Sequence, residues 1–135
     1  YNGVNTEYCW FVFESDKLSY DEQLAYIHNP IVYRAVYSGN KSIHLWVHVE
    51  NATFTNYEKI AVVINHYLLD DYSCRSCLRY DWRSCAPNVT NPDTGKIQEL
   101  LSNDHNCIMI NDTWLNKLYK EYNDSIIAAT GESIL

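Results

Sequence analysis

A β-hairpin over residues 36–49 is the feature that most limits what this chain can fold into. The segment VYSGNKSIHLWVHV places two runs of β-branched and aromatic residues on either side of a short polar turn. Gly39 and Asn40 are residue types that tolerate positive φ, as a tight turn between strands requires. We therefore expect paired strands over 31–37 and 42–49, and an antiparallel sheet to which both belong.

A strand and a helix are expected before the hairpin. Residues 8–13 are aromatic and β-branched, which favours a buried strand that ends at Glu14. Ser19 and Glu22 have the spacing of a capping box, in which each side chain satisfies a backbone amide at the start of a helix. The helix is expected to run as far as Pro30, because the residue before a proline avoids helical backbone angles.

Two more helices are expected after the hairpin. Thr55 and Glu58 repeat the capping-box spacing, and apolar residues follow them at helical intervals. A last helix is expected over about 112–122, with an apolar stripe on one side. Residues 72–95 lie between these helices with little periodicity, and a loop of this length in a compact domain usually has a function or wraps the core.

The order of these elements predicts an α+β fold, with an antiparallel sheet and helices packed on it. A chain of 135 residues, 47% of them hydrophobic, suits a single domain over 1–135. Because no apolar run reaches the roughly 18 residues that a membrane span requires, we expect no membrane partner. The chain begins with tyrosine rather than methionine, so we expect a piece of a longer polypeptide.

The net charge of −7 excludes a protein whose whole surface attracts nucleic acid. Polyanion binding requires lysine and arginine side chains to neutralise phosphates. A local basic patch stays possible, and it would depend on how the ten basic residues are arranged.

Five cysteines leave two interpretations open. Cys74 and Cys77, together with Cys85 and either Cys107 or His105, have the ligand types of a structural Zn²⁺ site. A single CxxC without a second close pair is a weak signal for zinc. Reduced cysteines without a metal are the alternative.

Two carboxylates follow the first expected strand. Glu14 and Asp16 are two residues apart, and because side chains alternate across a strand we expect both on the same face. Paired carboxylates repel unless a cation lies between them, and Mg²⁺ or Mn²⁺ prefers carboxylate oxygen. The alternative is that both acids are solvated or cap the loop before the next helix.

An anion site is expected at the exit of the hairpin turn. Ser42 and His44 alternate onto one strand face, and Lys41 lies beside the turn. Hydroxyl, imidazole, ammonium and turn amides can all donate to phosphate oxygens, which a triphosphate bridged to a metal would need. A buried structural histidine is the alternative for His44, and we interpret His48 as structural.

The segments FVFESDKLSYDEQLAYI, VYSGNKSIHLWVHV and LLDDYSCRSCLRYDWRSCAPNVTNPDTGKIQELL together resemble the catalytic core of the archaeo-eukaryotic primase superfamily. The likeness is greatest to the primase-polymerase modules of phages and plasmids. That family has an acidic-x-acidic pair on a strand, a Ser-x-His on the next hairpin and a hydrophobic-Asp after the following helix. The resemblance covers roughly residues 8–101, and SGNKSIH is its most specific motif.

The resemblance implies that acidic residues form a catalytic metal site. Glu14 and Asp16 match the first pair, and the third position falls on Asp71, with Asp70 as the reserve. These carboxylates would hold one or two Mg²⁺ or Mn²⁺ ions that activate a 3′-hydroxyl and neutralise charge on the leaving group.

The resemblance also implies a nucleotide site next to that metal site. Ser42 and His44 match the phosphate-binding motif, with Lys41 beside them, and Arg79 and Arg83 match the arginines that usually follow. The implied fold is an RRM-like sheet with the metal site on its open face and the helices behind.

The activity implied is template-directed nucleotidyl transfer by a DNA primase or polymerase, in the replication of a phage, plasmid or other mobile element. Its partners would be nucleoside triphosphates, a single-stranded DNA template and primer, and a replicative helicase domain in the full-length chain. The expected location is the cytoplasm of a bacterial or archaeal host cell.

Two other functions stay open from the sequence. A rolling-circle replication or relaxase-like endonuclease would bind a metal through His44 and His48, which lie on one strand face, and would use a tyrosine as nucleophile. A non-catalytic RRM-like module would bind single strands by stacking bases on exposed aromatic residues such as Tyr37, Trp46 and Tyr80.

Overall fold

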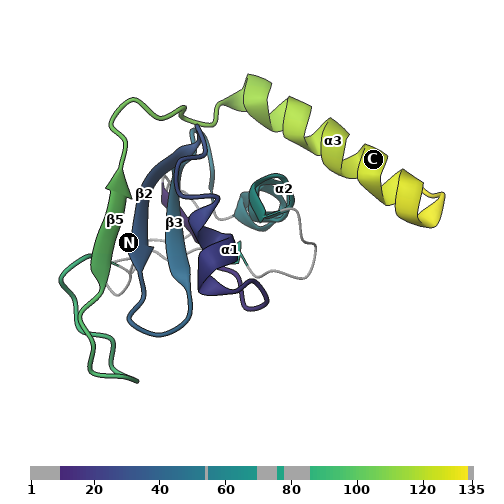
Figure 1. The fold of residues 1–135 in the computed structure, drawn as a ribbon. Coiled ribbons are helices and arrows are strands. Elements are labelled where there is room, and N and C mark those ends of the chain that lie inside the picture. Colours follow the sequence, from purple (N-terminus) through teal and green to yellow (C-terminus); the bar gives the residue numbers. More distant parts are fainter. Residues whose placement is uncertain (1–9, 54, 70–75, 78–85, 134–135) are drawn as a thin grey trace.

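The described part of the chain forms a five-stranded antiparallel sheet with three helices. The computed structural model describes residues 10–53, 55–69, 76–77 and 86–133, and for 76 and 77 it describes the backbone alone. The elements in chain order are β1 (Trp10–Phe13), α1 (Tyr20–Leu24), β2 (Val32–Tyr37), β3 (Ile43–His48), α2 (Tyr57–Leu69), β4 (Ser76–Cys77), β5 (Glu99–Asn103) and α3 (Asp112–Thr130) (Figure 1). Across the sheet the strand order is β4-β1-β3-β2-β5.

The first six elements follow the order β-α-β-β-α-β, which is that of a split βαβ unit. In this connectivity β1 and β3 are neighbours at the centre of the sheet, with β2 beyond β3 and β4 beyond β1. β1 and β3 pair from Trp10 opposite His48 to Phe13 opposite Leu45. The α+β class and the antiparallel sheet predicted from the sequence are therefore confirmed.

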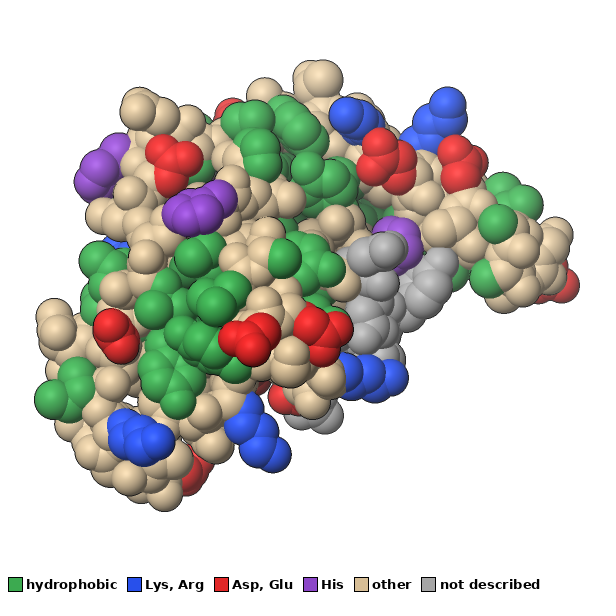
Figure 2. All heavy atoms as spheres, in the orientation of Figure 1, with side chains coloured by type: hydrophobic (Ala, Val, Ile, Leu, Met, Phe, Trp, Pro, Cys, Tyr) green, Lys and Arg blue, Asp and Glu red, His purple; other side chains and the backbone are tan. Residues whose placement is uncertain are grey.

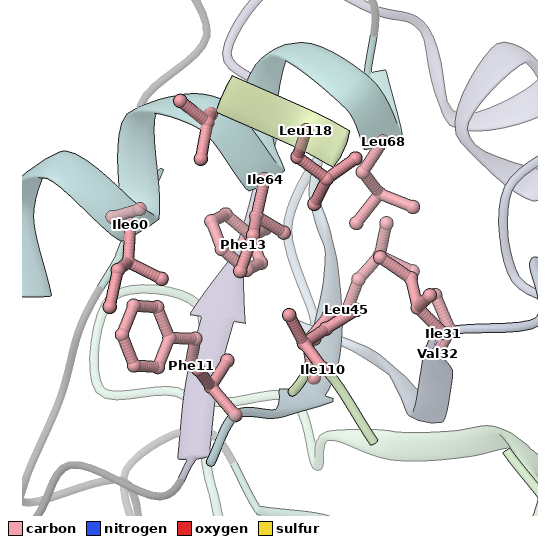
Figure 3. Packing of buried hydrophobic residues seen from close by; sticks show 14 of the residues in the cluster. Phe11, Phe13, Ile31, Val32, Leu45, Ile60, Ile64, Leu68, Ile110 and Leu118 are labelled. Atoms are coloured by element: carbon pink, nitrogen blue, oxygen red, sulfur yellow. The ribbon is translucent and has the colours of Figure 1, made fainter. Parts of the chain in front are cut away.

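All three helices pack on one face of the sheet. Phe11 and Phe13 of β1 are fully buried in a cluster to which each helix contributes, through Leu24 of α1, Ile64 of α2 and Leu118 of α3. Figure 3 shows Ile64 beside the ring of Phe13. Burial of this apolar surface is the main favourable contribution to folding, and it determines which side of each strand faces the helices.

A smaller cluster lies on the opposite face of the sheet. Val12 alternates with Phe11 and Phe13, so its side chain points away from the helices. It packs with Val36 of β2 and Trp46 of β3, and Trp10 lies against this group. This second face carries no helix among the described elements.

The hairpin predicted from the sequence is present with slightly shorter arms. Tyr37 of β2 is opposite Ile43 of β3, and residues 38–42 form the turn. Gly39 adopts φ +83° as expected, whereas Asn40 is not among the residues with positive φ. The glycine alone therefore supplies the conformation that the turn requires.

The first helix is shorter than predicted. The capping box is present, since the Ser19 hydroxyl accepts from the Glu22 amide at 3.2 Å and the Glu22 carboxylate accepts from the Ser19 amide at 3.1 Å. Hydrogen bonding from Ser19 to the Glu22 carboxylate, first of all from the Ser19 backbone amide and then from its side chain, holds the pKa of Glu22 below its usual value. Continuation to Pro30 was the wrong expectation, because after Leu24 the amides of 25–27 donate to carbonyls three residues earlier and tighten the chain into turns.

The second helix begins at Tyr57 rather than next to Thr55. Thr55 lies two residues before the first helical residue, so it is not the N-cap of the predicted capping box; its hydroxyl lies 3.0 Å from the Thr53 hydroxyl. The Asn56 carboxamide oxygen instead accepts from the Thr53 amide at 2.7 Å. The helical apolar stripe itself is confirmed, and its residues Ile60, Ala61, Val63, Ile64 and Leu68 are buried.

The last helix begins at Asp112 as predicted and continues to Thr130, past the expected end at Tyr122. Gly131 ends it with φ +79°, and its amide donates to the Ile127 carbonyl, a common helix terminator. Figure 1 shows the far half of α3 extending beyond the sheet. The expected end at Tyr122 was the last residue of the apolar stripe, but the helix itself continues beyond that stripe.

Strand β5 has no counterpart among the elements expected from the sequence. Its residues lack the β-branched pattern of a strand, and all five are exposed or half-buried. It forms by pairing with β2, with Glu99 opposite Tyr37 and Asn103 opposite Arg34. The free edge of the hairpin, rather than local preference, makes this segment a strand.

Within the described ranges, no helix has the length and apolar character needed to cross a membrane.

On the face seen in Figure 2, acidic and basic side chains are interspersed with hydrophobic ones. The basic side chains visible there do not gather into one continuous field.

Replacing Ile64 with alanine is expected to lower the free energy of unfolding by about 2–5 kcal/mol, because a cavity would open between α2 and the sheet. Val62 lies on the same helix but is 45% exposed, so Val62→Ala is expected to change it by less than about 0.5 kcal/mol. Urea titration followed by circular dichroism measures both values. Equal losses would contradict the packing of α2 described above.

Candidate functional site

A polar pocket of about 250 Å³ lies where the end of β1 meets the β2–β3 turn. Three segments of the chain form its walls: the residue that follows β1, the hairpin turn with the start of β3, and the stretch that leads into β5. The lining residues are Glu14 and His44, then Ser38, Asn40 and Ser42, then Asn91, Pro92, Asp93 and Gln98.

Glu14 and His44 form the floor of this pocket. Phe13 is opposite Leu45 in the β1–β3 ladder, so the residue that follows β1 and the preceding residue of β3 face each other. The Glu14 Oε2 and His44 Nε2 atoms lie 3.0 Å apart, although the residues are 30 positions apart in the sequence. The side chains are 23% and 10% exposed, so a charge on either is screened less by water than on an open surface.

The hairpin turn is closed by its own first residue. The Ser38 amide donates to the Ser42 carbonyl at 2.9 Å. The Ser38 hydroxyl accepts from the Asn40 amide at 3.3 Å and from the Ser42 amide at 3.2 Å. These two amides are therefore engaged inside the turn, and the expectation that turn amides serve as phosphate donors does not hold for them.

Gln23 connects α1 to the exit of the turn. Its side chain is almost fully buried and donates to the carbonyls of Leu18, at 2.9 Å, and Lys41, at 3.2 Å. Its carboxamide oxygen accepts from the Ile43 amide at 2.7 Å. The backbone on both sides of Ser42 is thus held by one side chain from the first helix.

The segment before β5 braces the turn from the other side. The Asn91 carboxamide donates to the Ser38 carbonyl at 2.6 Å, and the Thr94 hydroxyl donates to the Gly39 carbonyl at 2.9 Å. A Cβ on Gly39 would lie 3.2 Å from the Lys96 Cβ, so a side chain at this position would push the two segments apart. Gly39 is needed here for close approach as well as for its positive φ.

Sequence reasoning missed Gln23 and the Asn91 segment. The sequence signal for Gln23 was its position four residues before the apolar Ile27. In the helix expected from the sequence, this spacing places both residues on the side that faces the sheet. The segment NPDTGK has the residue types of a turn, but nothing in it indicates which loop it contacts. Asp93, a second carboxylate on the pocket, belongs to this segment.

The structure brings together three of the predicted site residues and separates two others. Glu14, Ser42 and His44 line one pocket. Asp16 is exposed and does not line it, and the Lys41 side chain is likewise exposed. The Lys41 backbone is held by Gln23 through its carbonyl.

The remaining predicted site residues lie outside the described residues. These are the third metal ligand Asp71, its reserve Asp70, and the arginines Arg79 and Arg83. Within the described part of the chain, no three side chains of histidine, cysteine, aspartate or glutamate gather into a metal-holding group.

Most of the predicted zinc ligands lie outside the described residues. These are Cys74, Cys85 and the side chain of Cys77. Cys107 is half-buried and is a free thiol. Burial, together with the nearby Asp104 carboxylate, raises the pKa of this thiol. The His105 ring lies against Tyr33, with its Nδ1 atom 3.4 Å from the tyrosine hydroxyl.

Comparison of the chain with protein-family models, with curated proteins and with solved structures found no match. The function proposed below therefore rests on the motifs in the sequence and on the geometry of this pocket.

Replacing Gln23 with leucine is expected to lower the free energy of unfolding by about 1–3 kcal/mol, because the Ile43 amide and two carbonyls lose their partner in a buried place. Hydrogen exchange at the Ile43 amide is expected to become faster. Asn116→Leu, at an exposed carboxamide of α3, is the matched control and is expected to change neither quantity much. An unchanged exchange rate in Gln23→Leu would show that Gln23 does not hold the turn.

Proposed function

We propose that this chain is a template-directed nucleotidyltransferase of the primase-polymerase type, built on an RRM-like sheet. It would join nucleoside triphosphates along a DNA template by divalent-metal catalysis. The observation that carries the proposal is that Glu14 and His44, which come from two different motifs, share one pocket with Ser42.

The convergence of the two motifs supports the proposal because the motifs were recognised separately. The acidic pair follows the end of β1, and the Ser-x-His motif spans the end of the hairpin turn and the start of β3. An acidic residue and a phosphate-binding motif have to be adjacent if a metal ion is to bridge them through a triphosphate. The 3.0 Å contact between Glu14 and His44 meets that requirement.

The size of the pocket suits the phosphate end of a nucleotide. A volume of about 250 Å³ is just below the roughly 300–1,000 Å³ of sites that enclose a drug-sized ligand. A triphosphate would fit inside while the base stays outside, where it can pair with a template. The hydroxyl of Ser42 and the imidazole of His44 are donors suited to phosphate oxygens.

The donor set of the pocket fits a hard divalent ion. Its oxygens come from the carboxylates of Glu14 and Asp93 and from the hydroxyl of Ser42, and no sulfur is found among the described lining residues. Oxygen ligands of this kind suit Mg²⁺ or Mn²⁺. When bound, such an ion supplies charge neutralisation and lowers the proton affinity of an attacking hydroxyl.

The Glu14–His44 contact gives each side chain a defined role. Glu14 would hold the ion with its carboxylate and give up its contact with His44. The His44 Nε2 atom would then donate to a phosphate oxygen, so the two side chains exchange partners when nucleotide and metal bind together. Asp16, Asp71, Lys41, Arg79 and Arg83 keep the roles that the family resemblance implies.

The relaxase-like alternative is less well supported. His44 and His48 are four residues apart on one strand, which separates their Cα atoms by about 13 Å. They also have different partners, because His44 contacts Glu14 while His48 stacks on Trp10. Two histidines at that separation do not share a metal ion.

His44→Ala is expected to weaken binding of a nucleoside triphosphate in the presence of Mn²⁺ by about 10–100-fold, because a charge-assisted hydrogen bond of about 1.5–3 kcal/mol is lost. Glu14→Gln is expected to remove the dependence of that binding on Mn²⁺. Isothermal titration calorimetry measures both effects. Glu99→Gln, which changes an exposed carboxylate of β5, is the control.

Two outcomes of this titration count against the proposal. Equal affinity in wild type and His44→Ala would remove His44 from the site. A wild-type protein that neither binds triphosphate with Mn²⁺ nor extends a primer would contradict the nucleotidyltransferase assignment itself.

Asp16→Ala is expected to abolish nucleotide incorporation while the domain stays folded, because the family resemblance makes Asp16 a metal ligand and its side chain is exposed. A primer-extension assay with Mn²⁺ measures incorporation, and circular dichroism checks the fold. Asp21→Ala removes another exposed carboxylate nearby, on α1, and is expected to retain activity. Wild-type rates for Asp16→Ala would refute the role of this residue.

A further inference from the structure

Aromatic rings form a layer on the sheet face opposite the helices. The Trp10 ring of β1 lies nearly parallel to the His48 ring of β3, with centroids 4.5 Å apart and an interplanar angle of 16°. The Tyr33 ring, next to Val32 in β2, approaches Trp10 at 4.9 Å. Because β3 lies between β1 and β2, this contact crosses over β3.

Arg34 completes the layer. Its guanidinium carbon lies 4.5 Å from the ring centroid of Trp46 and 5.6 Å from that of Tyr33. We call Trp10, Tyr33, Arg34 and His48 the ring layer; all four are partly exposed.

The sequence had suggested Trp46 as an exposed stacking residue, and this expectation was wrong. Trp46 is 1% exposed, since it lies in the small cluster beneath Trp10 and Arg34. Tyr37, the second residue suggested, is half-buried with its ring edge-on to Tyr20, and Tyr80 lies outside the described residues. Among the described residues of this sheet face, the ring layer is therefore the aromatic surface that solvent can reach.

The ring layer lies on the same sheet face as the pocket. Residues two apart on a strand share a face, and each such step is about 7 Å. From the Glu14–His44 pair, one step along β3 reaches Trp46 opposite Val12, and a second step reaches His48 opposite Trp10. The ring layer therefore begins about 7 Å and ends about 13 Å from the floor of the pocket.

Arg34 gives this face a charge that no described carboxylate neutralises. Among the described residues the ion pair within 4.0 Å is that of His44 with Glu14, and Arg34 has none. A cation held against aromatic rings, with its outer side in solvent, is suited to a phosphate group.

We propose that the ring layer binds a single-stranded nucleic acid, with bases stacked on Trp10 and Tyr33 and a phosphate paired with Arg34. A single strand presents flat bases and a charged backbone together, and the layer presents rings and a guanidinium group together. Arg34 favours this polyanion over an apolar peptide, which would leave the charge without a counterpart. The inference rests on the proposed function only in that the strand would lead into the nucleotide pocket.

The test uses the full chain and a labelled oligothymidylate of about 15 nucleotides, near the upper end of known site sizes. Fluorescence anisotropy is measured in EDTA without nucleotide, so that the pocket and its metal play no part. Trp10→Ala is expected to weaken binding about tenfold or more, since stacking on one aromatic residue is lost. Arg34→Gln is expected to weaken binding and to reduce the slope of log affinity against log salt by about one.

Controls separate the surface from general effects on folding and charge. Lys117→Gln is matched to Arg34→Gln, because the Lys117 ammonium lies over the Trp114 ring at 5.0 Å on α3, away from this face. It is expected to leave affinity and salt slope unchanged. Tyr33→Leu keeps apolar volume while it removes a stacking ring, so it tests the layer even if Trp10→Ala fails to fold.

The outcomes distinguish this inference from the proposed function. Wild-type protein that does not bind the oligonucleotide overturns the inference, as does wild-type affinity in both Tyr33→Leu and Arg34→Gln, whatever the pocket binds. Oligonucleotide binding that depends on these residues supports it, even if the calorimetry with triphosphate and Mn²⁺ contradicts the nucleotidyltransferase proposal.

Discussion

Antiparallel pairing of β1 with β3 is the constraint on which the rest of the structure depends. The register that places Phe11 and Phe13 toward the helices also places Glu14 opposite His44 on the other face. A slip of one residue would reverse the direction of every side chain on β1, exposing two phenylalanines and separating the pair. Core burial and the geometry of the candidate site are therefore maintained by the same interaction.

A second set of contacts shapes the pocket around that pair. Ser38 closes the hairpin turn from within, Gln23 holds its exit from α1, and Asn91 holds its start from the segment before β5. All three use side-chain hydrogen bonds to backbone groups that are largely shielded from water, where an unmade bond is costly. A loop held in this way keeps Ser42 and His44 in place, which is the preorganisation from which the proposed phosphate recognition would benefit.

Local patterns predicted the elements whose form depends on neighbouring residues. The alternation around Gly39, the capping box of Ser19 and the apolar stripe of α2 all appear in the structure. Two errors arose where distant contacts decided the outcome. Strand β5 exists because the edge of β2 is available to it, and α1 ends early because the chain must turn to enter β2.

The sequence by itself determined the α+β class, the hairpin and the candidacy of Glu14, Ser42 and His44, because strand alternation, turn residues and motif spacing are local properties. Only the tertiary structure decided that Glu14 and His44 touch, that Asn91 and Asp93 complete the pocket, and that Trp10 rather than Trp46 meets solvent. These outcomes depend on strand order and register, and contacts between residues far apart in the chain are not encoded in the pattern of either segment alone.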